Sequence, residues 1–303
     1  MPAAVLQTGK NRFIDPKVLV KIQNMELVAR AVVEGFVSGL HRSPYLGFSV
    51  DFAEYRDYQP GDDLRRVDWN VYSRMDKLVL KLFEGETNTK DMILLDVSGS
   101  MKYGSGEVSK IDYARILAAC LAYFAYHQRD GVGLLTFDTA VRDYVPAARR
   151  AGQLPNLLHI IDRIQPNKET EFRKPLRHLA EILKRRGIIV LISDLYDEVE
   201  NIMAGLKQLK AKGNDIIVFH IMDEFELTFP FEENAQFEDL ETLKKMHIIP
   251  DHLRTQYLKI IGDHMKQLSA EMAANRIDYT LMNTSKPLDQ GLFNYLAARA
   301  KTV

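Results

Sequence analysis

The sequence is poor in cysteine and has no excess of charge of either sign. Its 303 residues include one cysteine, Cys120, which lies in the apolar run 116–122. No disulfide framework can form within the chain, which fits a reducing compartment, and we expect Cys120 to be a small core residue. The formal net charge at pH 7 is −1, whereas a nucleic-acid-binding protein normally carries a strongly basic balance or face. We therefore expect no nucleic-acid partner.

Targeting signals and the motifs of several enzyme classes are also lacking. The first ten residues do not follow the order of a signal peptide, and no stretch is long and apolar enough to cross a bilayer. We expect a soluble, cytoplasmic protein. The histidines show no zinc-site spacing, and neither a Gly-x-x-x-x-Gly-Lys nucleotide loop nor a Gly-x-Ser-x-Gly elbow occurs.

The first 88 residues differ in pattern from the rest. Apolar residues recur every three or four positions over 16–40, which predicts a helix. Apolar and polar residues alternate over 45–58 and 78–83, which predicts two strands, with a charged connector between them. We interpret residues 1–88 as a small N-terminal α+β module.

Beyond residue 88, short apolar runs alternate with amphipathic helices. Strands are expected at 91–96, 131–137, 187–194, 215–222 and 278–282, and helices at 111–128, 154–164, 175–186, 199–212, 251–275 and from 288. Such alternation predicts an α/β fold with a doubly wound, mainly parallel, Rossmann-like sheet covered by helices on both faces. Residues 89–303 would form this domain, interrupted at about 223–248 by an insertion that we interpret as a hairpin plus a loop.

Oxygen-bearing side chains gather where strands of this sheet end. Asp96, Ser98 and Ser100 place one carboxylate and two hydroxyls at alternate positions of one loop, and Asp194 ends a later central strand. Ligands of doubly wound sheets bind outside the carboxyl ends of the strands, so the two strand ends should be neighbours. Thr170, before a later helix, offers another hydroxyl. Hard oxygen ligands of this kind suit Mg²⁺.

The order Asp-x-Ser-x-Ser, then a Thr, then a strand-end Asp resembles the metal-ion-dependent adhesion site of von Willebrand A domains. The resemblance covers roughly residues 89–300. It implies five metal ligands in a surface loop cluster: Asp96, Ser98, Ser100, Thr170 and Asp194. It also implies a bound Mg²⁺, with Mn²⁺ as the alternative, and a partner protein whose Asp or Glu fills the remaining metal position.

Other interpretations of these residues stay open. The three residues of the first loop could serve only to cap the next helix, as Ser and Asp often do. Thr136 and Thr139 compete with Thr170 for the role of the third hydroxyl. Asp197 competes with Asp194, although it falls beyond the strand end.

The segment 52–69, FAEYRDYQPGDDLRRVDW, followed by Arg74, resembles the hallmark of family 58 of the bacterial domains of unknown function. That family joins such a module to a von Willebrand A-like domain. The resemblance implies an adaptor or chaperone-like partner of a MoxR-type AAA+ ATPase, associated with Bat-type proteins. Many members carry N-terminal membrane helices, which this sequence does not show. We expect the charged segment 57–70 to form a structural ion-pair network, with a direct binding role as the alternative.

We therefore expect a Mg²⁺-dependent protein-binding module and not an enzyme. The serines lack a base at recognisable spacing, and a metal-bound hydroxyl is not an activated nucleophile. One alternative is a phosphoester hydrolase in which Asp96 or Asp194 positions a water on the metal. That reaction needs groups that clamp the phosphate, and Ser98 stands where a second aspartate would support it. The other alternative is a structural domain whose metal site has decayed.

Overall fold

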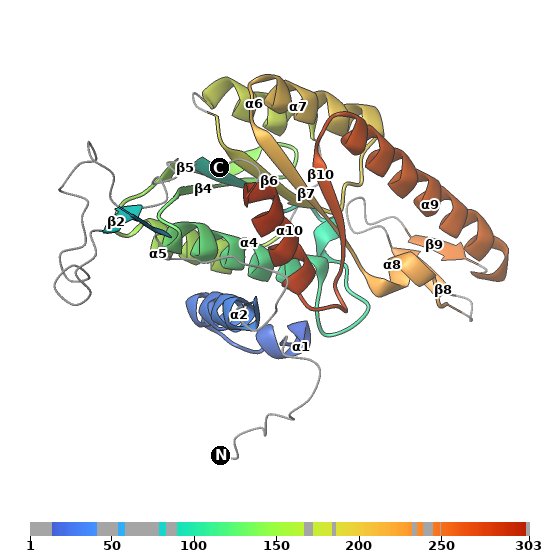
Figure 1. The fold of residues 1–303 in the computed structure, drawn as a ribbon. Coiled ribbons are helices and arrows are strands. Elements are labelled where there is room, and N and C mark those ends of the chain that lie inside the picture. Colours follow the sequence, from blue (N-terminus) through green and yellow to red (C-terminus); the bar gives the residue numbers. More distant parts are fainter. Residues whose placement is uncertain are drawn as a thin grey trace, which may run out of the picture.

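The computed structural model describes most of the chain beyond residue 90 and three shorter segments before it (Figure 1). The described residues are 14–40, 54–57, 79–82, 90–166, 172–183, 186–231, 235–238, 245–248 and 250–300. Thr170 and most of the charged segment 57–70 lie outside them, so the predictions for these residues stay predictions.

Six strands form one sheet in the order β10-β7-β6-β3-β4-β5, and all neighbours are parallel except β4 and β5. The strands are β3 (Lys90–Asp96), β4 (Gly131–Phe137), β5 (Val141–Ala148), β6 (Ile188–Ser193), β7 (Asp215–Met222) and β10 (Asp278–Asn283). The prediction of an α/β fold with a doubly wound, mainly parallel sheet is confirmed. The antiparallel edge strand β5 was not predicted.

Helices cover both faces of this sheet (Figure 1). One face carries α4 (Lys110–His127), α5 (Gln153–Arg163) and α10 (Asp289–Ala300), and the other carries α6 (Arg173–Ile182), α7 (Val199–Ala211) and α9 (Pro250–Ala274). Successive side chains of a strand point to opposite faces. Accordingly, Ile93 and Leu95 enter the core under α4, whereas Met92 and Leu94 enter the core under α6 and α7.

The predicted helix over 16–40 is wrong as one element, because the chain bends between α1 (Pro16–Leu19) and α2 (Met25–Leu40). Asn24 starts the second helix by accepting a hydrogen bond from the backbone N–H of Leu27 (3.0 Å). The buried face of α2 packs on α4 and shares its core, and its buried members are Val28, Ala29, Val33 and Phe36. The predicted module therefore supplies core contacts to the main domain; the boundary at residue 88 stays a prediction.

Two further pairs of short strands are antiparallel: β1 (Glu54–Asp57) with β2 (Val79–Leu82), and β8 (Ala235–Glu238) with β9 (Lys245–Ile248). The second pair is the hairpin expected in the insertion. A short helix that was not predicted, α8 (Glu224–Thr228), precedes this hairpin. Its capping box is formed by Asp223 and Glu226.

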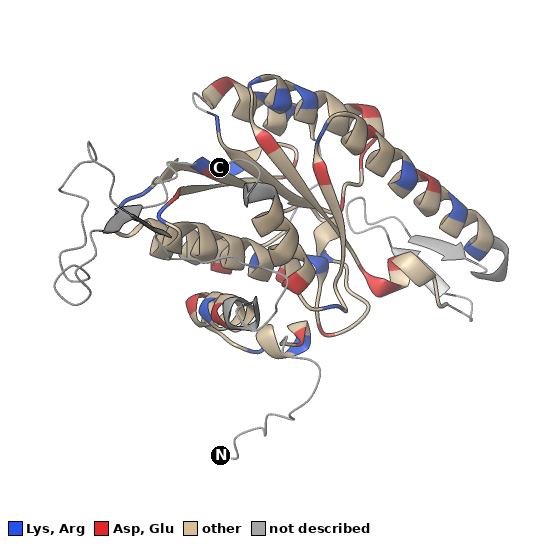
Figure 2. Cartoon of the chain, in the orientation of Figure 1, with Lys and Arg blue, Asp and Glu red and all other residues tan. Residues whose placement is uncertain are grey.

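Charges of both signs are interspersed along α9 and across α6 and α7 (Figure 2). The ion pair between Lys207 and Glu271 joins α7 to α9 at 3.2 Å. None of the helices in the described part of the chain combines the length and apolar character needed to cross a membrane.

Two glycines give a matched test of helix packing. A Cβ on Gly205 of α7 would lie 2.7 Å from Cβ of Leu176 on α6, whereas a Cβ on Gly262 of α9 would meet nothing within 4 Å. We expect Gly205→Ala to lower the free energy of unfolding by about 1–3 kcal/mol. We expect Gly262→Ala to raise it by up to about 1 kcal/mol, since alanine favours the helix. Urea denaturation measures both, and equal effects would contradict the tight α6–α7 packing.

Candidate metal site

The candidate site lies where the strand order of the sheet reverses. The chain passes from β3 to β4 and β5 on one side and then returns to β6 on the other side of β3. Asp96 is the last residue of β3, and Ser193 is the last residue of β6. The expectation that these two strand ends are neighbours is confirmed. Such a switch point is the usual place of a ligand in doubly wound sheets.

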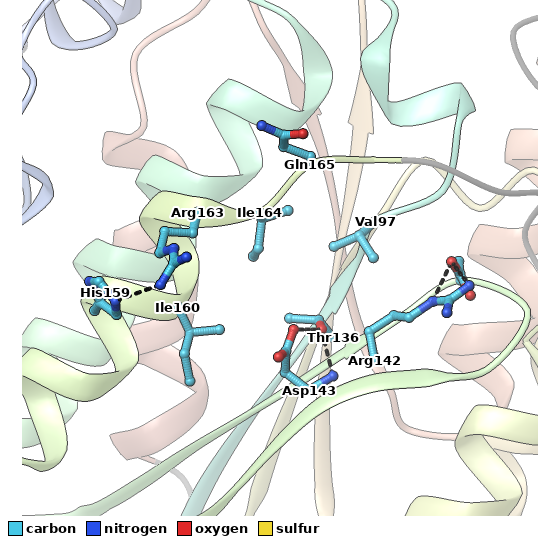
Figure 3. A pocket seen from close by; sticks show the side chains of 10 residues that line it. Val97, Thr136, Arg142, Asp143, His159, Ile160, Arg163, Ile164 and Gln165 are labelled. Atoms are coloured by element: carbon cyan, nitrogen blue, oxygen red, sulfur yellow. Dashed lines mark hydrogen bonds and ion pairs between the residues drawn. The ribbon is translucent and has the colours of Figure 1, made fainter.

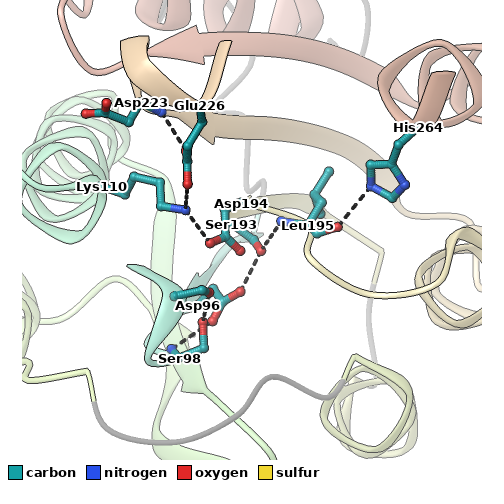
Figure 4. A network of polar contacts seen from close by, with 10 residues as sticks. Asp96, Ser98, Lys110, Ser193, Asp194, Leu195, Asp223, Glu226 and His264 are labelled. Carbon is teal, nitrogen blue, oxygen red and sulfur yellow. Dashed lines mark hydrogen bonds and ion pairs between the residues drawn. The ribbon is translucent and has the colours of Figure 1, made fainter. Parts of the chain in front are cut away.

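Asp96 is fully buried and is held by two hydrogen bonds (Figure 4). Its Oδ1 accepts from the backbone N–H of Ser98 (2.9 Å), and its Oδ2 accepts from the hydroxyl of Ser193 (2.5 Å). Burial and then the neighbouring charge of Asp194 raise the pKa of Asp96 to about 7, against the pull of these bonds. A cation beside Asp96 would favour its ionised form.

The two serine hydroxyls of the loop lie together. The Oγ atoms of Ser98 and Ser100 are 3.0 Å apart, Ser98 is fully buried, and Ser100 is partly exposed. Ser100 opens the short 3₁₀ helix Ser100–Lys102, which turns the chain toward α4. Three of the five predicted ligands thus share one tight turn at the end of β3.

Asp194 follows β6 directly, and its side chain is fully buried. Its Oδ2 accepts a hydrogen bond from Nζ of Lys110 (2.8 Å), whereas its Oδ1 is buried without any hydrogen-bond partner. An unsatisfied buried carboxylate oxygen is costly, and such an atom calls for a missing ion or water. The Oδ1 atom of Asp194 is therefore the clearest sign of a ligand in the site.

Lys110, the first residue of α4, was not predicted to belong to the site. Its ammonium group is fully buried, lies 2.8 Å from both Asp194 Oδ2 and Glu226 Oε1, and sits 4.6 Å above the centre of the Tyr196 ring. Burial opposes its charge, but the two carboxylates outweigh burial and raise the pKa of Lys110. One feature of the sequence pointed to this contact, because a lysine in the first turn of a helix opposes the helix dipole and an acidic partner would offset that cost.

The two threonines and the aspartate that competed for roles in the site have other partners, and the Thr139 hydroxyl donates to Asp138 Oδ1 (3.4 Å). The Thr136 hydroxyl donates to Asp143 Oδ2 (2.7 Å), which joins β4 to β5. Asp197 accepts from the backbone N–H of Glu198 (2.7 Å) and from the side chain of Asn201 (2.9 Å) at the start of α7. These hydrogen bonds account for the polar side chains of Thr136 and Asp197 without a metal ligand role.

A pocket of about 370 Å³ opens beside the turn that carries Asp96, Ser98 and Ser100 (Figure 3). Val97, between Asp96 and Ser98, forms one wall, and α5 and the β4–β5 hairpin form the others. Its side chains pair with each other, such as Arg163 with His159 (3.2 Å). The edge of the sheet therefore carries a recess next to the candidate ligands.

The residues fit a hard divalent cation better than a soft one. Within the described ranges, no group of three or more His, Cys, Asp or Glu side chains is arranged to hold a metal. The site instead combines two carboxylates with two hydroxyls, a donor set suited to Mg²⁺ with retained waters. The prediction of a surface site is wrong for the side chains of Asp96, Ser98 and Asp194, which are fully buried at the ends of β3 and β6.

The chain was compared with protein families and with curated proteins. The family model described as "Protein of unknown function DUF58" matches residues 54–267. An uncharacterized protein of Mycobacterium tuberculosis (strain ATCC 25618 / H37Rv) is 23% identical over 293 residues, which cover 95% of this chain and 91% of that protein. An uncharacterized protein of Mycobacterium bovis matches with the same identity and coverage.

Solved structures to which the chain is similar include the conserved hypothetical protein BatB from Bacteroides thetaiotaomicron. It is 14% identical, with a TM-score of 0.47 and coverage of 70% of this chain and 99% of that chain. The SpRpn10 VWA domain is also 14% identical, with a TM-score of 0.39 and coverage of 69% and 95%.

Proposed function

This chain belongs to the DUF58 family, and we propose that it is a protein-binding module that holds one Mg²⁺ ion at the carboxyl edge of its sheet. Asp96, Ser98, Ser100 and Asp194 would hold the ion together with Thr170. The observation that carries the proposal is the buried, partnerless Oδ1 atom of Asp194, next to a carboxylate whose pKa is raised. Bound Mg²⁺ would supply a site for an Asp or Glu of the partner.

The partner that we propose is a MoxR-type AAA+ ATPase, for which the chain would act as an adaptor or chaperone-like factor beside Bat-type proteins. Support comes from the sequence of segment 52–69 and its resemblance to the family hallmark. The recess beside Val97 would accommodate partner residues that flank the metal-binding carboxylate.

We propose binding rather than catalysis. A phosphoryl-transfer site needs cations that clamp the phosphate. Lys110, the ammonium group beside the candidate ligands, is bonded to two carboxylates at 2.8 Å and is shielded from solvent. This arrangement favours a partner's carboxylate on the metal over hydrolysis of a phosphoester.

Retention of a purified MoxR-type ATPase on the immobilised chain tests the function. We expect retention in Mg²⁺, loss in chelator, and at least a tenfold weaker complex for Asp96→Asn, since losing one good charged contact costs about 1.4 kcal/mol or more. Equal retention in chelator would refute metal-dependent binding. Metal-dependent release of phosphate from p-nitrophenyl phosphate, abolished by the same variant, would instead support the hydrolase.

A further inference from the structure

Three charged side chains from distant parts of the sequence form a buried ion-pair network that includes the candidate ligand Asp194 (Figure 4). Lys110 of α4 bonds to Asp194 after β6 and to Glu226 of α8, which are 84 and 116 positions away. The side chains of Lys110 and Asp194 are fully buried, and that of Glu226 is 10% exposed. Solvent therefore screens these contacts little.

The carboxylates of Asp194 and Glu226 differ in what their second oxygen atoms contact. Asp194 keeps its Oδ1 free of protein partners at the candidate metal site. Glu226 accepts the backbone N–H of Asp223 (2.8 Å) and so forms the first turn of α8. Asp223 itself accepts from the backbone of Ser105 (3.1 Å) and the hydroxyl of Thr284 (3.1 Å). Lys110 thus links the candidate ligand Asp194 directly to α8.

The signs of the charges predict how this link acts on a divalent cation. The positive charge of Lys110 neutralises Asp194 and repels a second cation, so it weakens metal binding. The negative charge of Glu226 offsets Lys110, so it strengthens metal binding. A bound Mg²⁺ would attract the Asp194 carboxylate and so weaken its ion pair with Lys110. The ion pair between Lys110 and Glu226 would then become stronger and would hold α8 more firmly.

We infer that Lys110 and Glu226 are positioning residues that set the Mg²⁺ affinity of the site and couple metal binding to the docking of α8. This inference rests on the proposed metal site. Coupling between binding and a conformational change is reciprocal, so a docked α8 favours the metal as much as the metal favours docking.

Calorimetric titration of the full-length chain with Mg²⁺ tests the predicted signs. Lys110→Gln, which keeps a hydrogen-bond donor, should lower the dissociation constant about tenfold, and Glu226→Gln should raise it about tenfold. The double variant should lie within about threefold of the unaltered chain, because it loses one positive and one negative charge and the net charge beside the site stays the same. Lys207→Gln, an exposed site on α7, is the matched control and should change nothing measurable.

Hydrogen exchange of the backbone amides of residues 223–229 and 231 gives a second readout. Mg²⁺ should slow their exchange in the unaltered chain and leave it unchanged in Glu226→Gln. If Lys110 had only a structural role, both Lys110→Gln and Glu226→Gln would weaken Mg²⁺ binding. That result would overturn this inference and leave the proposed metal site standing. Absence of Mg²⁺ binding in the unaltered chain would overturn the metal site as well. If Lys110→Gln does not fold, the Glu226→Gln titration and exchange decide the outcome.

Discussion

Replacing Lys110 with methionine should lower the free energy of unfolding by about 3–5 kcal/mol, the usual cost of breaking a buried ion pair from one side. Methionine fits the space of the aliphatic stem but leaves Asp194 and Glu226 without their shared counter-charge. Both carboxylates would then be buried close together. Urea denaturation of the metal-free chain measures the loss.

The control for this prediction is an exposed lysine in the same fold. Lys207 pairs with Glu271 at 3.2 Å, and their side chains are 50% and 44% exposed. Lys207→Met should cost no more than about 1 kcal/mol, because exposed ion pairs contribute little. Comparable losses at Lys110 and Lys207 would contradict the role of Lys110 as a buried counter-ion.

Saturating Mg²⁺ should stabilise the chain by about 2.7 kcal/mol when its free concentration is 100 times the dissociation constant. For a domain of this size the melting temperature should rise by roughly 2–4 °C for each kcal/mol. Asp96→Asn should abolish this rise, since the variant loses a charged ligand. Thermal unfolding with and without Mg²⁺ measures the effect.

Asparagine is a better replacement here than alanine because Asp96 is buried and accepts two hydrogen bonds. It keeps the shape of the side chain and removes a charge that burial disfavours. The metal-free variant should therefore fold normally. If Mg²⁺ raised the melting temperature of the variant and of the unaltered chain equally, the ion would have to bind elsewhere.

The central strands could be predicted from the sequence because a strand that is buried on both faces consists almost entirely of apolar residues. The run 188–193 is apolar apart from its last residue, and all six of its residues are buried. The edge strand β5 could not be found in this way. Val145 is the one residue of this strand that is buried, and Arg142, Asp143 and Tyr144 are exposed in succession, so its pattern resembles a loop.

The candidate ligands were also predictable because a local pattern and a topological rule suffice. Asp96, Ser98 and Ser100 lie within five residues, and Asp194 directly follows a strand that the rule places beside them. Their burial was not predictable, since it depends on how distant loops fold over the strand ends.

The pair of Lys110 and Glu226 shows the limit of reasoning from local pattern. Each residue alone resembles a solvated charge at a helix start, and 116 positions separate them. Their contact arises because Asp223, which caps α8, accepts a hydrogen bond from the backbone of Ser105 in the loop before α4. Tertiary structure alone brings these charges together, and the helix-dipole conflict at Lys110 was the only local hint.

A crystal structure of the full-length chain grown with Mn²⁺ in place of Mg²⁺ tests the metal site most directly, because anomalous scattering locates the ion. We expect one ion in contact with the hydroxyls of Ser98 and Ser100 and next to Asp96 and Asp194 Oδ1. Mn²⁺ bound only elsewhere, or no ion at saturating Mn²⁺, with the contacts of Asp194 unchanged, would contradict the proposed site.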